Sequence, residues 1–454
     1  MKTIASIANK MNEKILEKIN SRSLKICVVG IGYVGLPTAA LFSEQGFNVV
    51  GLDLNEDIVL KVNNGGSHIK EPGLDSLIEN NISAGRLSAT SKISEALDDS
   101  DVVIISVQTP IDNEKRPDLR YLVNAVEQLG RLLRREMLVA ICSTVPPGTT
   151  VNLIKPLLEE LSGLKCESDF YLAYVPERIA PGKALKELVE NTRLVGGIGE
   201  KSTKFAAELF RTICRDIKET SCTNAELSKL IENTYRDVNI AFANQVALIC
   251  EHYGADAKEV IALANTHPRV NVLSPGPGAG GPCLTKDPYL LVHGLDPELQ
   301  RLIFLARQIN EYMPIHLVKM VDTALRSIGR RLGDSKITVL GTAYKPNVDD
   351  PRESPSKVII ETLIKQGAKV VAYDPYCKEY FGAEKTSDLF EAAKGSDCLI
   401  ITTDHSEFKS IDLGQLGRLM LNRLIVDAKR IFDPAEAERK GFRYFAIGLG
   451  NNEK

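Results

Sequence analysis

The 454-residue sequence has no run of 18 apolar residues, no C-x-x-C pair and no large excess of charge of either sign. The first absence argues against a transmembrane helix. The second argues against a zinc site and a disulfide framework, because the nine cysteines are scattered without regular spacing. A net charge of −3 argues against nucleic-acid binding through a generally basic surface. We therefore expect mostly buried cysteines, a cytoplasmic location, no metal, and neither a nucleic-acid nor a membrane partner.

The first 23 residues have apolar side chains at roughly helical spacing, with lysines and glutamates between them. No apolar h-region is present, so a signal peptide is not expected. The segment is predicted to be an amphipathic helix that packs on its own domain or on a sister subunit, and binding to a membrane surface is the weaker alternative. Its apolar positions are Ile4, Ile7, Met11, Ile15 and Ile19.

The length and an apolar content of 44% indicate two or three globular domains. The first contains an apolar run, Leu24 to Val29, then Gly30-Ile31-Gly32-Tyr33-Val34-Gly35 and a helical stretch. A second predicted strand, Asn48 to Leu52, is followed by Asp53. This order predicts a dinucleotide-binding unit, in which the first glycine makes the turn, the second admits a pyrophosphate and the third lets helix pack on strand. Asp53 would bind the ribose hydroxyls, which favours NAD over NADP.

Three further apolar runs are predicted to be parallel strands with polar residues after their C-terminal ends: Asp101 to Val107, Leu138 to Cys142 and Tyr171 to Val175. In open α/β sheets, ligands bind at that edge. Thr109, Thr144 and Glu177 are therefore candidate site residues, although each could instead cap the following helix.

The character of the sequence changes near residue 214. Thr223-x-x-Glu226 resembles a capping box that opens a helix running to about His252. Lys229 and Asn233 share one face of this helix with Glu226. The alternative for Glu226 is the helix cap alone, and for Lys229 and Asn233 it is a solvent-exposed face.

A second long helix is predicted to open at Asp296-Pro297-Glu298, and Pro314 should interrupt or restart it. Residues 214 to 330 are thus expected to be all-helical and to offer a natural dimer surface.

The first pattern returns after Arg331, where residues 336–341, 367–374 and 396–401 echo residues 25–30, 46–53 and 100–105. The second copy lacks the later glycines, so a turn that holds a pyrophosphate is not expected there. Lys345, Arg352 and Arg430 instead provide positive charge suited to a phosphate of a different ligand.

A glycine-rich loop with a single thiol, Gly280-Gly281-Pro282-Cys283-Leu284-Thr285-Lys286-Asp287, separates the two helical patterns. Glycine permits close approach of a ligand to the backbone, and a neighbouring cation lowers the pKa of a thiol. Cys283 is therefore a candidate nucleophile, although such a segment by itself is more often only a loop.

Several separated motifs together resemble the UDP-glucose/GDP-mannose dehydrogenases, which are NAD-dependent four-electron oxidases of nucleotide sugars. The resemblance covers about Leu24 to Phe445. The motifs are Gly30-x-Gly32-x-x-Gly35, Thr109-Pro110, Ser143-Thr144-Val145-Pro146-Pro147-Gly148, Pro176-Glu177-Arg178, Glu226-x-x-Lys229-x-x-x-Asn233, Gly280-Gly281-x-Cys283-x-x-Lys286-Asp287 and Arg352-Glu353-Ser354.

The resemblance implies an α/β fold with two Rossmann-like doubly wound parallel-sheet domains flanking a central all-helical domain. The expected divisions are an N-terminal extension (1–23), an NAD-binding domain (24–213), a helical dimerisation domain (214–330) and a C-terminal UDP-sugar-binding domain (331–454). A homodimer or higher homo-oligomer is expected.

The resemblance also implies roles for individual residues. Catalytic roles fall on Cys283, Lys229, Asn233, Asp287, Glu177 and Thr144. NAD binding falls on Gly30, Ile31, Gly32, Tyr33, Val34, Gly35, Asp53, Thr109 and Arg352. Substrate binding falls on Glu177, Arg178, Lys229, Asn233, Gly280, Tyr344, Lys345, Arg430 and Arg269, the last reaching the partner subunit's substrate. Lys286 is left without a role.

Two segments, Pro176 to Gly182 and His267 to Asn271, are most similar to the UDP-N-acetylmannosamine branch. Two residues depart from it: Pro282 stands where many of these enzymes carry a histidine, and Lys286 resembles the UDP-glucose branch. UDP-N-acetylglucosamine and UDP-glucose therefore remain alternative substrates. More distant alternatives are a two-electron hydroxyacid dehydrogenase, which would not need Cys283, and a non-catalytic nucleotide-sugar binder.

Overall fold

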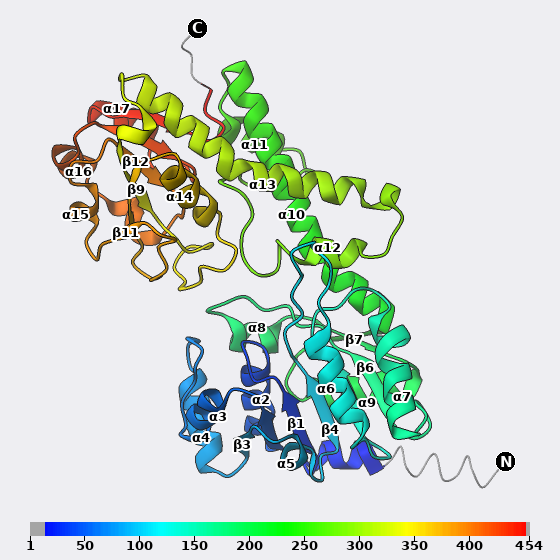
Figure 1. Cartoon of the computed structure of the whole chain (residues 1–454). Helices are drawn as coiled ribbons and strands as arrows, with labels where there is room; N and C mark the ends of the chain where they lie inside the picture. The colour runs from blue at the N-terminus through cyan, green and yellow to red at the C-terminus, as the bar shows by residue number, and fades with distance from the viewer. Residues whose placement is uncertain (1–13, 451–454) are drawn as a thin grey trace. The chain divides into compact units, whose positions relative to one another are not determined.

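The computed structural model describes residues 14–450, and these form two compact units. Unit 1 contains the described residues up to Glu232 together with Tyr289–His293. Unit 2 contains Asn233–Pro288 and the described residues from Gly294 onward. Each unit is built around one sheet (Figure 1).

The sheet of unit 1 has eight strands in the order β3-β2-β1-β4-β5-β6-β7-β8. Neighbouring strands are parallel, except that β7 runs antiparallel to β6. The order reverses between β1 and β4, which is where doubly wound sheets open a crevice for a ligand. The strands are β1 (Lys25–Val29), β2 (Asn48–Leu52), β3 (Leu87–Thr90), β4 (Val102–Ile105), β5 (Leu138–Ile141), β6 (Tyr171–Tyr174), β7 (Arg193–Gly197) and β8 (Ile217–Ser221).

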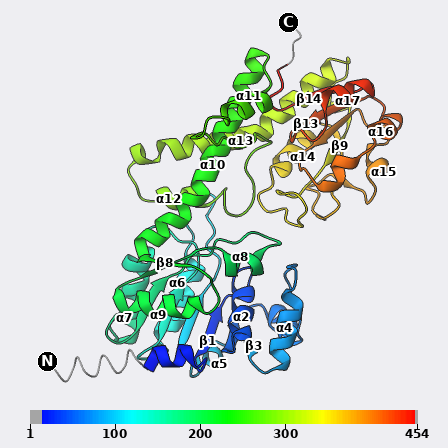
Figure 2. The same ribbon diagram turned by 180° about the vertical axis from the view of Figure 1, so that it is seen from behind.

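Both faces of this sheet are buried, because residues along β1 alternate between two hydrophobic cores. Ile26 and Val28 pack with α2, α4 and α9, whereas Cys27 and Val29 pack with α5, α6 and α7. Figure 2 shows the unit from behind. The helices are α2 (Gly35–Glu44), α3 (Glu56–Asn63), α4 (Leu74–Ser83), α5 (Ile93–Leu97), α6 (Arg120–Gly130), the π-helical turn η1 (Thr150–Ile154), α7 (Lys155–Ser162), α8 (Ala184–Glu190) and α9 (Glu200–Arg211).

The N-terminal segment is helical over residues 14–20. Ile15 and Ile19 are buried in the core that includes α2, so this part of the predicted amphipathic helix packs on its own unit. Ile4, Ile7 and Met11 lie outside the described residues.

The helical region begins later than predicted. Ile217–Ser221 forms β8, an edge strand paired with β7, so the expectation that residues from 214 onward are all-helical is wrong. The sequence of this strand, IKETS, is polar and half-exposed, so it contains no apolar run from which a strand could be predicted. The helices that follow are α10 (Cys222–Tyr253), α11 (Ala257–Ala264), α12 (Asp287–Val292) and α13 (Pro297–Arg326), then a short 3-10 turn, η2 (Leu332–Asp334).

Pro314 lies inside α13 without ending it, so the predicted interruption is wrong. A proline in a helix interior lacks the N–H that would bond the carbonyl four residues earlier. That carbonyl belongs to Asn310, and Gly278 packs against it. Burial of Met313, Leu317 and Val321 in the core of unit 2 keeps the helix intact despite the lost bond.

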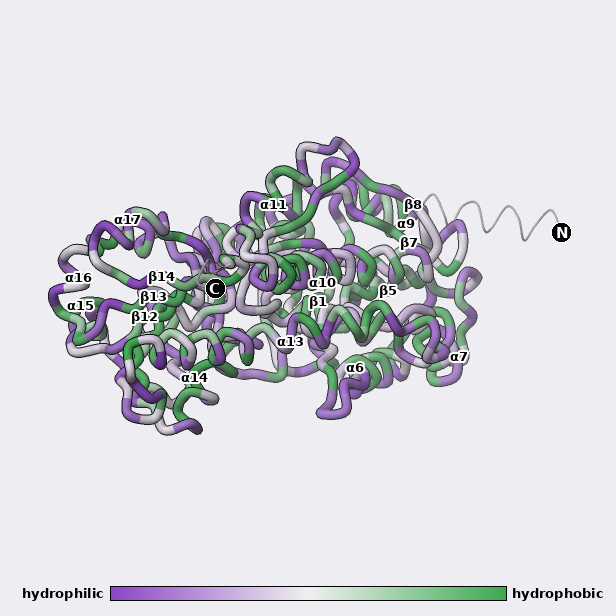
Figure 3. The backbone as a smooth tube through the Cα atoms, turned by 90° about the horizontal axis from the view of Figure 1, so that it is seen from above, coloured by the Kyte–Doolittle hydropathy of each residue, from purple (hydrophilic) through white to green (hydrophobic). Residues whose placement is uncertain are grey.

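The sheet of unit 2 has six parallel strands in the order β11-β10-β9-β12-β13-β14. The strands predicted from the sequence repeat are β9, β10 and β12. Figure 3 traces the hydropathy along the chain, with the apolar strands in green. The strands are β9 (Lys336–Leu340), β10 (Lys369–Tyr373), β11 (Glu384–Lys385), β12 (Cys398–Ile401), β13 (Leu424–Asp427) and β14 (Arg443–Ala446).

One face of this second sheet packs against α13 and α14 together with parts of α10 and α11, and the other against α16 and α17. The fold class is therefore as predicted: two parallel-sheet domains, with the long helices between them in the sequence. The remaining helices are α14 (Pro355–Lys365), α15 (Leu389–Ala393), the 3-10 turn η3 (Ser406–Ser410), α16 (Leu413–Leu419) and α17 (Pro434–Arg439). Among residues 14–450, no helix is both long and apolar enough to cross a membrane.

Candidate active site

The glycine turn of unit 1 has the geometry that a dinucleotide requires. Gly30 has a φ of +83°, and a Cβ there would lie 2.8 Å from the carbonyl oxygen of Ser106. A Cβ on Gly35 would lie 1.9 Å from the carbonyl oxygen of Gly30, so only glycine lets α2 pack this closely. Gly32 faces open space, with nothing within 4 Å of its ideal Cβ. The turn therefore leaves room for a pyrophosphate at the N-terminus of α2.

Asp53 follows β2 beside this turn. Its Oδ2 accepts a hydrogen bond from the backbone N–H of Ile31 (3.2 Å), and its Oδ1 accepts one from Asn55 (3.0 Å). Thr109 and Thr144, predicted from neighbouring strands, are also brought together, because the Thr109 hydroxyl donates to the carbonyl oxygen of Thr144 (2.5 Å). These residues line the C-terminal edge of the sheet, where the sequence predicted them.

Glu177 forms a buried ion pair that the sequence did not reveal. Its Oε2 lies 2.6 Å from Nη2 of Arg193 at the start of β7, and both side chains are less than a tenth exposed. Its Oε1 accepts from the backbone N–H of Arg178 (2.7 Å). The Arg178 side chain pairs with Glu232 of α10 (2.6 Å).

Glu226 does not form the predicted capping box. Its carboxylate accepts hydrogen bonds from the backbone N–H groups of Gly148 (2.6 Å) and Thr150 (2.9 Å) and from the Thr150 hydroxyl (2.6 Å). α10 begins at Cys222, before Thr223, so Glu226 faces the loop after β5 rather than its own N-terminus. Burial raises the pKa of Glu226, and the three donors oppose that shift. The residue therefore fixes the loop that follows Thr144.

Glu71 is a second residue that sequence reasoning missed. Its carboxylate accepts from the Tyr33 hydroxyl (3.1 Å) and from the backbone N–H groups of Gly182 (2.9 Å) and Ala184 (2.6 Å). It therefore joins the glycine turn to the segment after Glu177 that was predicted to bind substrate. Its signal in the sequence, a lone glutamate before Pro72-Gly73, points only to a turn.

Cys283 differs from the other eight cysteines because its side chain is exposed, whereas seven are buried and Cys166 is half-buried. Burial raises the pKa of Cys142 and Cys222 to about 12, which makes these thiols inert. The Cys283 carbonyl accepts from the backbone N–H groups of Lys286 (3.1 Å) and Asp287 (2.8 Å). This tight turn leads directly into α12.

Asp287 and Asn233, two of the predicted catalytic residues, contact each other. The Asn233 side-chain amide donates to Oδ2 of Asp287 (2.6 Å), and both residues are buried. Oδ1 of Asp287 is buried and accepts no hydrogen bond from the described residues, and Lys286 Nζ lies 3.9 Å away. Lys229 belongs to unit 1, but it lies on the same helix, α10, four residues before Asn233 and therefore one turn away on the same face.

Tyr344 packs directly on residues 276–284, the segment that carries Cys283 and is called the cysteine loop below. Gly281 has a φ of +88°, and a Cβ there would lie 2.6 Å from the Tyr344 ring. A Cβ on Gly280 would meet the carbonyl oxygen of Glu353 at 2.7 Å. Burial, followed by the charge of Asp350, raises the pKa of Tyr344 to about 12, so its hydroxyl stays neutral.

Two of the predicted arginines have carboxylate partners within unit 2. Arg352 makes a bidentate pair with Asp350 (2.9 and 2.7 Å), and Arg430 makes one with Asp256 at the N-terminus of α11 (3.0 and 2.8 Å). Arg269 is exposed, and Lys345 follows Tyr344 and is partly buried. The ligand-binding roles of these four residues stay predictions.

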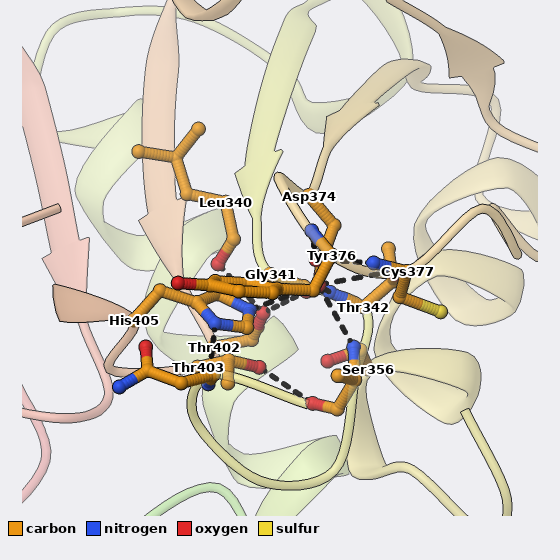
Figure 4. A network of polar contacts seen from close by, with 12 residues as sticks. Leu340, Gly341, Thr342, Ser356, Asp374, Tyr376, Cys377, Thr402, Thr403 and His405 are labelled. Atoms are coloured by element: carbon orange, nitrogen blue, oxygen red, sulfur yellow. Dashed lines mark hydrogen bonds and ion pairs between the residues drawn. The ribbon is translucent and has the colours of Figure 1, made fainter. Parts of the chain in front are cut away.

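The turn after β9 is closed by a carboxylate of the protein itself. Asp374 Oδ2 accepts from the backbone N–H groups of Thr342 (2.7 Å) and Ala343 (3.0 Å) and lies 3.0 Å from Nε2 of His405. The Tyr376 ring stacks on His405 (Figure 4). Burial alone would raise the pKa of Asp374, but the His405 bond and the backbone N–H groups hold it at about 2. The donors that would meet a pyrophosphate are thus already used.

Family models match three consecutive parts of the chain. They describe an NAD binding domain over residues 24–214, a central domain over 223–312 and a UDP binding domain over 338–434, all of one family. The chain belongs to the UDP-glucose/GDP-mannose dehydrogenase family. It is therefore an NAD-dependent dehydrogenase that acts on a nucleotide sugar, and the open Gly32 turn of unit 1 fits that cofactor.

Individual family members align over almost the whole chain. A UDP-N-acetyl-D-mannosamine dehydrogenase from Pyrococcus horikoshii is 42% identical over 94% of this chain and 100% of its own length. A solved UDP-D-ManNAc dehydrogenase structure from Pyrococcus horikoshii, 41% identical, matches 94% of this chain and 100% of its own with a TM-score of 0.88. An NDP-N-acetyl-D-galactosaminuronic acid dehydrogenase from Ralstonia nicotianae is 37% identical over 89% of this chain and 95% of its own length.

Proposed function

We propose that this dehydrogenase oxidises the C6 alcohol of a UDP-N-acetylhexosamine, UDP-N-acetyl-D-mannosamine first among them, to the uronic acid through a covalent intermediate on Cys283. The observation that carries the proposal is the setting of Cys283. It is the exposed cysteine among nine, and its own turn connects it to Asp287, which Asn233 holds.

A cysteine nucleophile makes the second of the two oxidations possible. The first oxidation gives an aldehyde, whose carbonyl carbon carries no oxyanion to expel a second hydride. Addition of the Cys283 thiolate forms a C–S bond and a tetrahedral alkoxide, from which hydride departs to leave a thioester. Water then breaks the C–S bond, which releases the carboxylate and restores the thiol. Bound NAD supplies the hydride acceptor for both oxidations.

The stoichiometry of the overall reaction follows from these steps. One alcohol, two NAD⁺ and one water give one carboxylate, two NADH and three protons. The ratio of NADH to sugar therefore separates the proposal from the two-electron alternative, which predicts one NADH.

The other predicted catalytic groups receive roles that suit their surroundings. Lys229 and Asn233, one helical turn apart, would donate to the oxygen that becomes anionic. Asp287, with one buried oxygen that accepts no bond from the described residues, would bind the hydrolytic water, and Thr144 keeps the catalytic role that the family resemblance implies. Glu177, which pairs with Arg193, would act as the acid/base of thioester hydrolysis.

The substrate is proposed from the relatives. The Pyrococcus horikoshii relative carries the name of a UDP-N-acetyl-D-mannosamine enzyme, and the Ralstonia nicotianae relative that of an N-acetyl-D-galactosaminuronic acid enzyme. Both names contain an N-acetylated sugar, which supports an acetamido group on the substrate of this chain. UDP-glucose is the comparison substrate.

A substrate panel tests the proposal. Purified protein would be given UDP-N-acetylmannosamine, UDP-N-acetylglucosamine or UDP-glucose with NAD⁺, and NADH absorbance and the acid product would be quantified. We expect the highest kcat/KM with UDP-N-acetylmannosamine and two NADH for each sugar consumed. A ratio of one would refute the four-electron chemistry, and a preference for UDP-glucose would refute the sugar assignment.

We also propose a homodimer, with Arg269 reaching the partner's substrate. α10 exposes large apolar side chains at seven-residue spacing, Tyr235, Phe242 and Ile249, which are 60%, 56% and 46% exposed. An apolar stripe of this kind is typical of an interface. Light scattering should give a dimer for the wild type and a monomer for Phe242→Glu. A monomeric wild type would contradict the proposal.

A further inference from the structure

A cluster of buried polar side chains lies between α10 and α13 in unit 2. Its members are Asp237 and Asn244 of α10 and Arg307 and Asn310 of α13, and each is at most 3% exposed. Arg307 Nη1 donates to Oδ1 of Asp237 (2.7 Å). The same oxygen accepts from Nδ2 of Asn310 (2.8 Å), whose Oδ1 accepts from Nδ2 of Asn244 (2.9 Å). The four side chains therefore form one continuous hydrogen-bonded chain.

This α10–α13 polar cluster reaches the cysteine loop at both ends. Oδ1 of Asn244 accepts from the backbone N–H of Gly276 (2.9 Å), seven residues before Cys283. At the other end, Arg307 Nη1 also lies 3.4 Å from the carbonyl oxygen of Leu284, the residue after Cys283. The loop between these two contacts carries the nucleophile.

Pro314 adds a third contact between α13 and the loop. Because proline has no N–H, the Asn310 carbonyl has no helical partner at this position. Gly278, with a φ of +120°, lies against that carbonyl, where a Cβ would come within 2.7 Å. The loop is thus fitted to α13 at a point where the helix lacks its usual hydrogen bond.

Stability alone is a weak reason for such a cluster. A buried ion pair such as Asp237–Arg307 gains little over apolar residues of similar volume, because both charges lose their hydration. Burial raises the pKa of Asp237, and Arg307 opposes that shift. Apolar residues could not form the bond to the Gly276 N–H or the contact with the Leu284 carbonyl, so these two contacts distinguish the polar cluster from an apolar one.

We propose that Asp237, Asn244, Arg307 and Asn310 are positioning residues that hold residues 276–284 in place and thereby aim Cys283 at the substrate carbon. The proposal rests on the nucleophilic role proposed for Cys283. The first hydride transfer does not use the thiol, so loosening the loop should impair the second oxidation more than the first. Aldehyde should then escape before the thiol captures it.

The test compares two variants with a matched control. Asn244→Leu removes the acceptor for Gly276, and the double variant Asp237→Leu/Arg307→Met replaces both members of the buried ion pair with apolar groups. Arg307 also pairs with Glu311 (3.2 Å), but the Glu311 side chain is 45% exposed, so water can hydrate that carboxylate in the variant. Thr338→Val is the control, because the buried Thr338 hydroxyl on β9 bonds the Ala392 carbonyl of α15 and the Ser396 hydroxyl and does not contact the loop. All are made in the full chain.

Two measurements are made on each protein. Backbone hydrogen exchange of residues 276–284 should be at least about tenfold faster in both cluster variants and unchanged in Thr338→Val. In the assay with UDP-N-acetylmannosamine and a hydroxylamine trap, kcat should fall by about 10- to 100-fold with KM changed less than about threefold. NADH per sugar consumed should fall from two towards one as trapped aldehyde rises.

The outcomes distinguish failure of the positioning role from failure of the proposed four-electron function. Unchanged exchange in the loop, or a turnover loss no larger than that of Thr338→Val with the NADH ratio kept at two, overturns the positioning role. A wild-type ratio of one overturns the proposed four-electron function instead, and the hydrogen exchange result still decides whether the cluster orders the loop.

Discussion

Replacement of Gly281 by alanine tests how tightly the cysteine loop is fitted to its surroundings. A Cβ at this position would lie 2.6 Å from Cε2 of Tyr344 and 2.9 Å from two other ring atoms, whereas ordinary contact starts at 3.4 Å. The φ of +88° costs an L-residue about 1–2 kcal/mol on its own. Relief of the clash requires the ring or the loop to move, which adds about 1–3 kcal/mol.

Gly294 provides the matched control in the same unit. Its φ is +73°, but nothing lies within 4 Å of its ideal Cβ, so Gly294→Ala has only the backbone cost of about 1–2 kcal/mol. Chemical denaturation should therefore show Gly281→Ala to be the less stable variant. Turnover should fall by about 100-fold in Gly281→Ala, because a shift of about 1 Å at a reacting group has that effect, and it should be kept in Gly294→Ala.

A second substitution checks the cause. In the double variant Gly281→Ala/Tyr344→Leu the smaller side chain makes room for the new methyl group, so the two stability changes should be less than additive by at least about 0.5 kcal/mol. Equal stability losses in Gly281→Ala and Gly294→Ala, together with normal turnover in both, would refute the reasoning. Strict additivity in the double variant would exclude the Tyr344 ring as the obstacle.

Three further predictions concern single residues. Cys283→Ser should form no acid and release at most one NADH per sugar, and two NADH at the wild-type rate would remove the nucleophile from the scheme. Lys229→Ala should raise the barrier to turnover by about 2–4 kcal/mol with little change in KM, and an unchanged kcat would contradict its role as an oxyanion donor. The folded-state pKa of Asp374 is about 2, below the ordinary 3.8, so its charge stabilises the fold above pH 4 and the effect is lost as pH falls from about 4 to 2. Asp374→Asn should therefore be less stable than wild type by roughly 2 kcal/mol at pH 7 and equally stable near pH 2; a difference independent of pH would refute this.

Local sequence patterns predicted the first sheet's core strands well. β1, β2 and β5 are continuous apolar runs because both of their faces are buried, and such runs are visible without any knowledge of their neighbours. The glycine turn was also predictable from local sequence, because the positive φ of Gly30 and the close packing at Gly35 exclude other residues. β8 escaped detection because an edge strand needs no apolar run.

The polar pairings of the site were not predictable. Glu177 lies 16 residues from its partner Arg193, Asp237 lies 70 from Arg307, and Glu226 lies 76 from Thr150. None of these pairs has a spacing that local structure explains, because they arise only when separate elements pack. The capping-box pattern at Thr223 and the helix-breaking pattern at Pro314 failed for this reason: a long-range partner or a buried core outweighed the local preference.

Helix α10 carries Glu226, Lys229, Asn233, Asp237 and Asn244 within 19 residues. One inserted or deleted residue in that stretch would turn everything beyond it by about 100° and shift it by about 1.5 Å. All five side chains could not then keep their partners, whereas a point substitution affects one of them at a time. We therefore expect evolution to vary the amino acids of this segment far more readily than its length, and protein engineers should place insertions elsewhere.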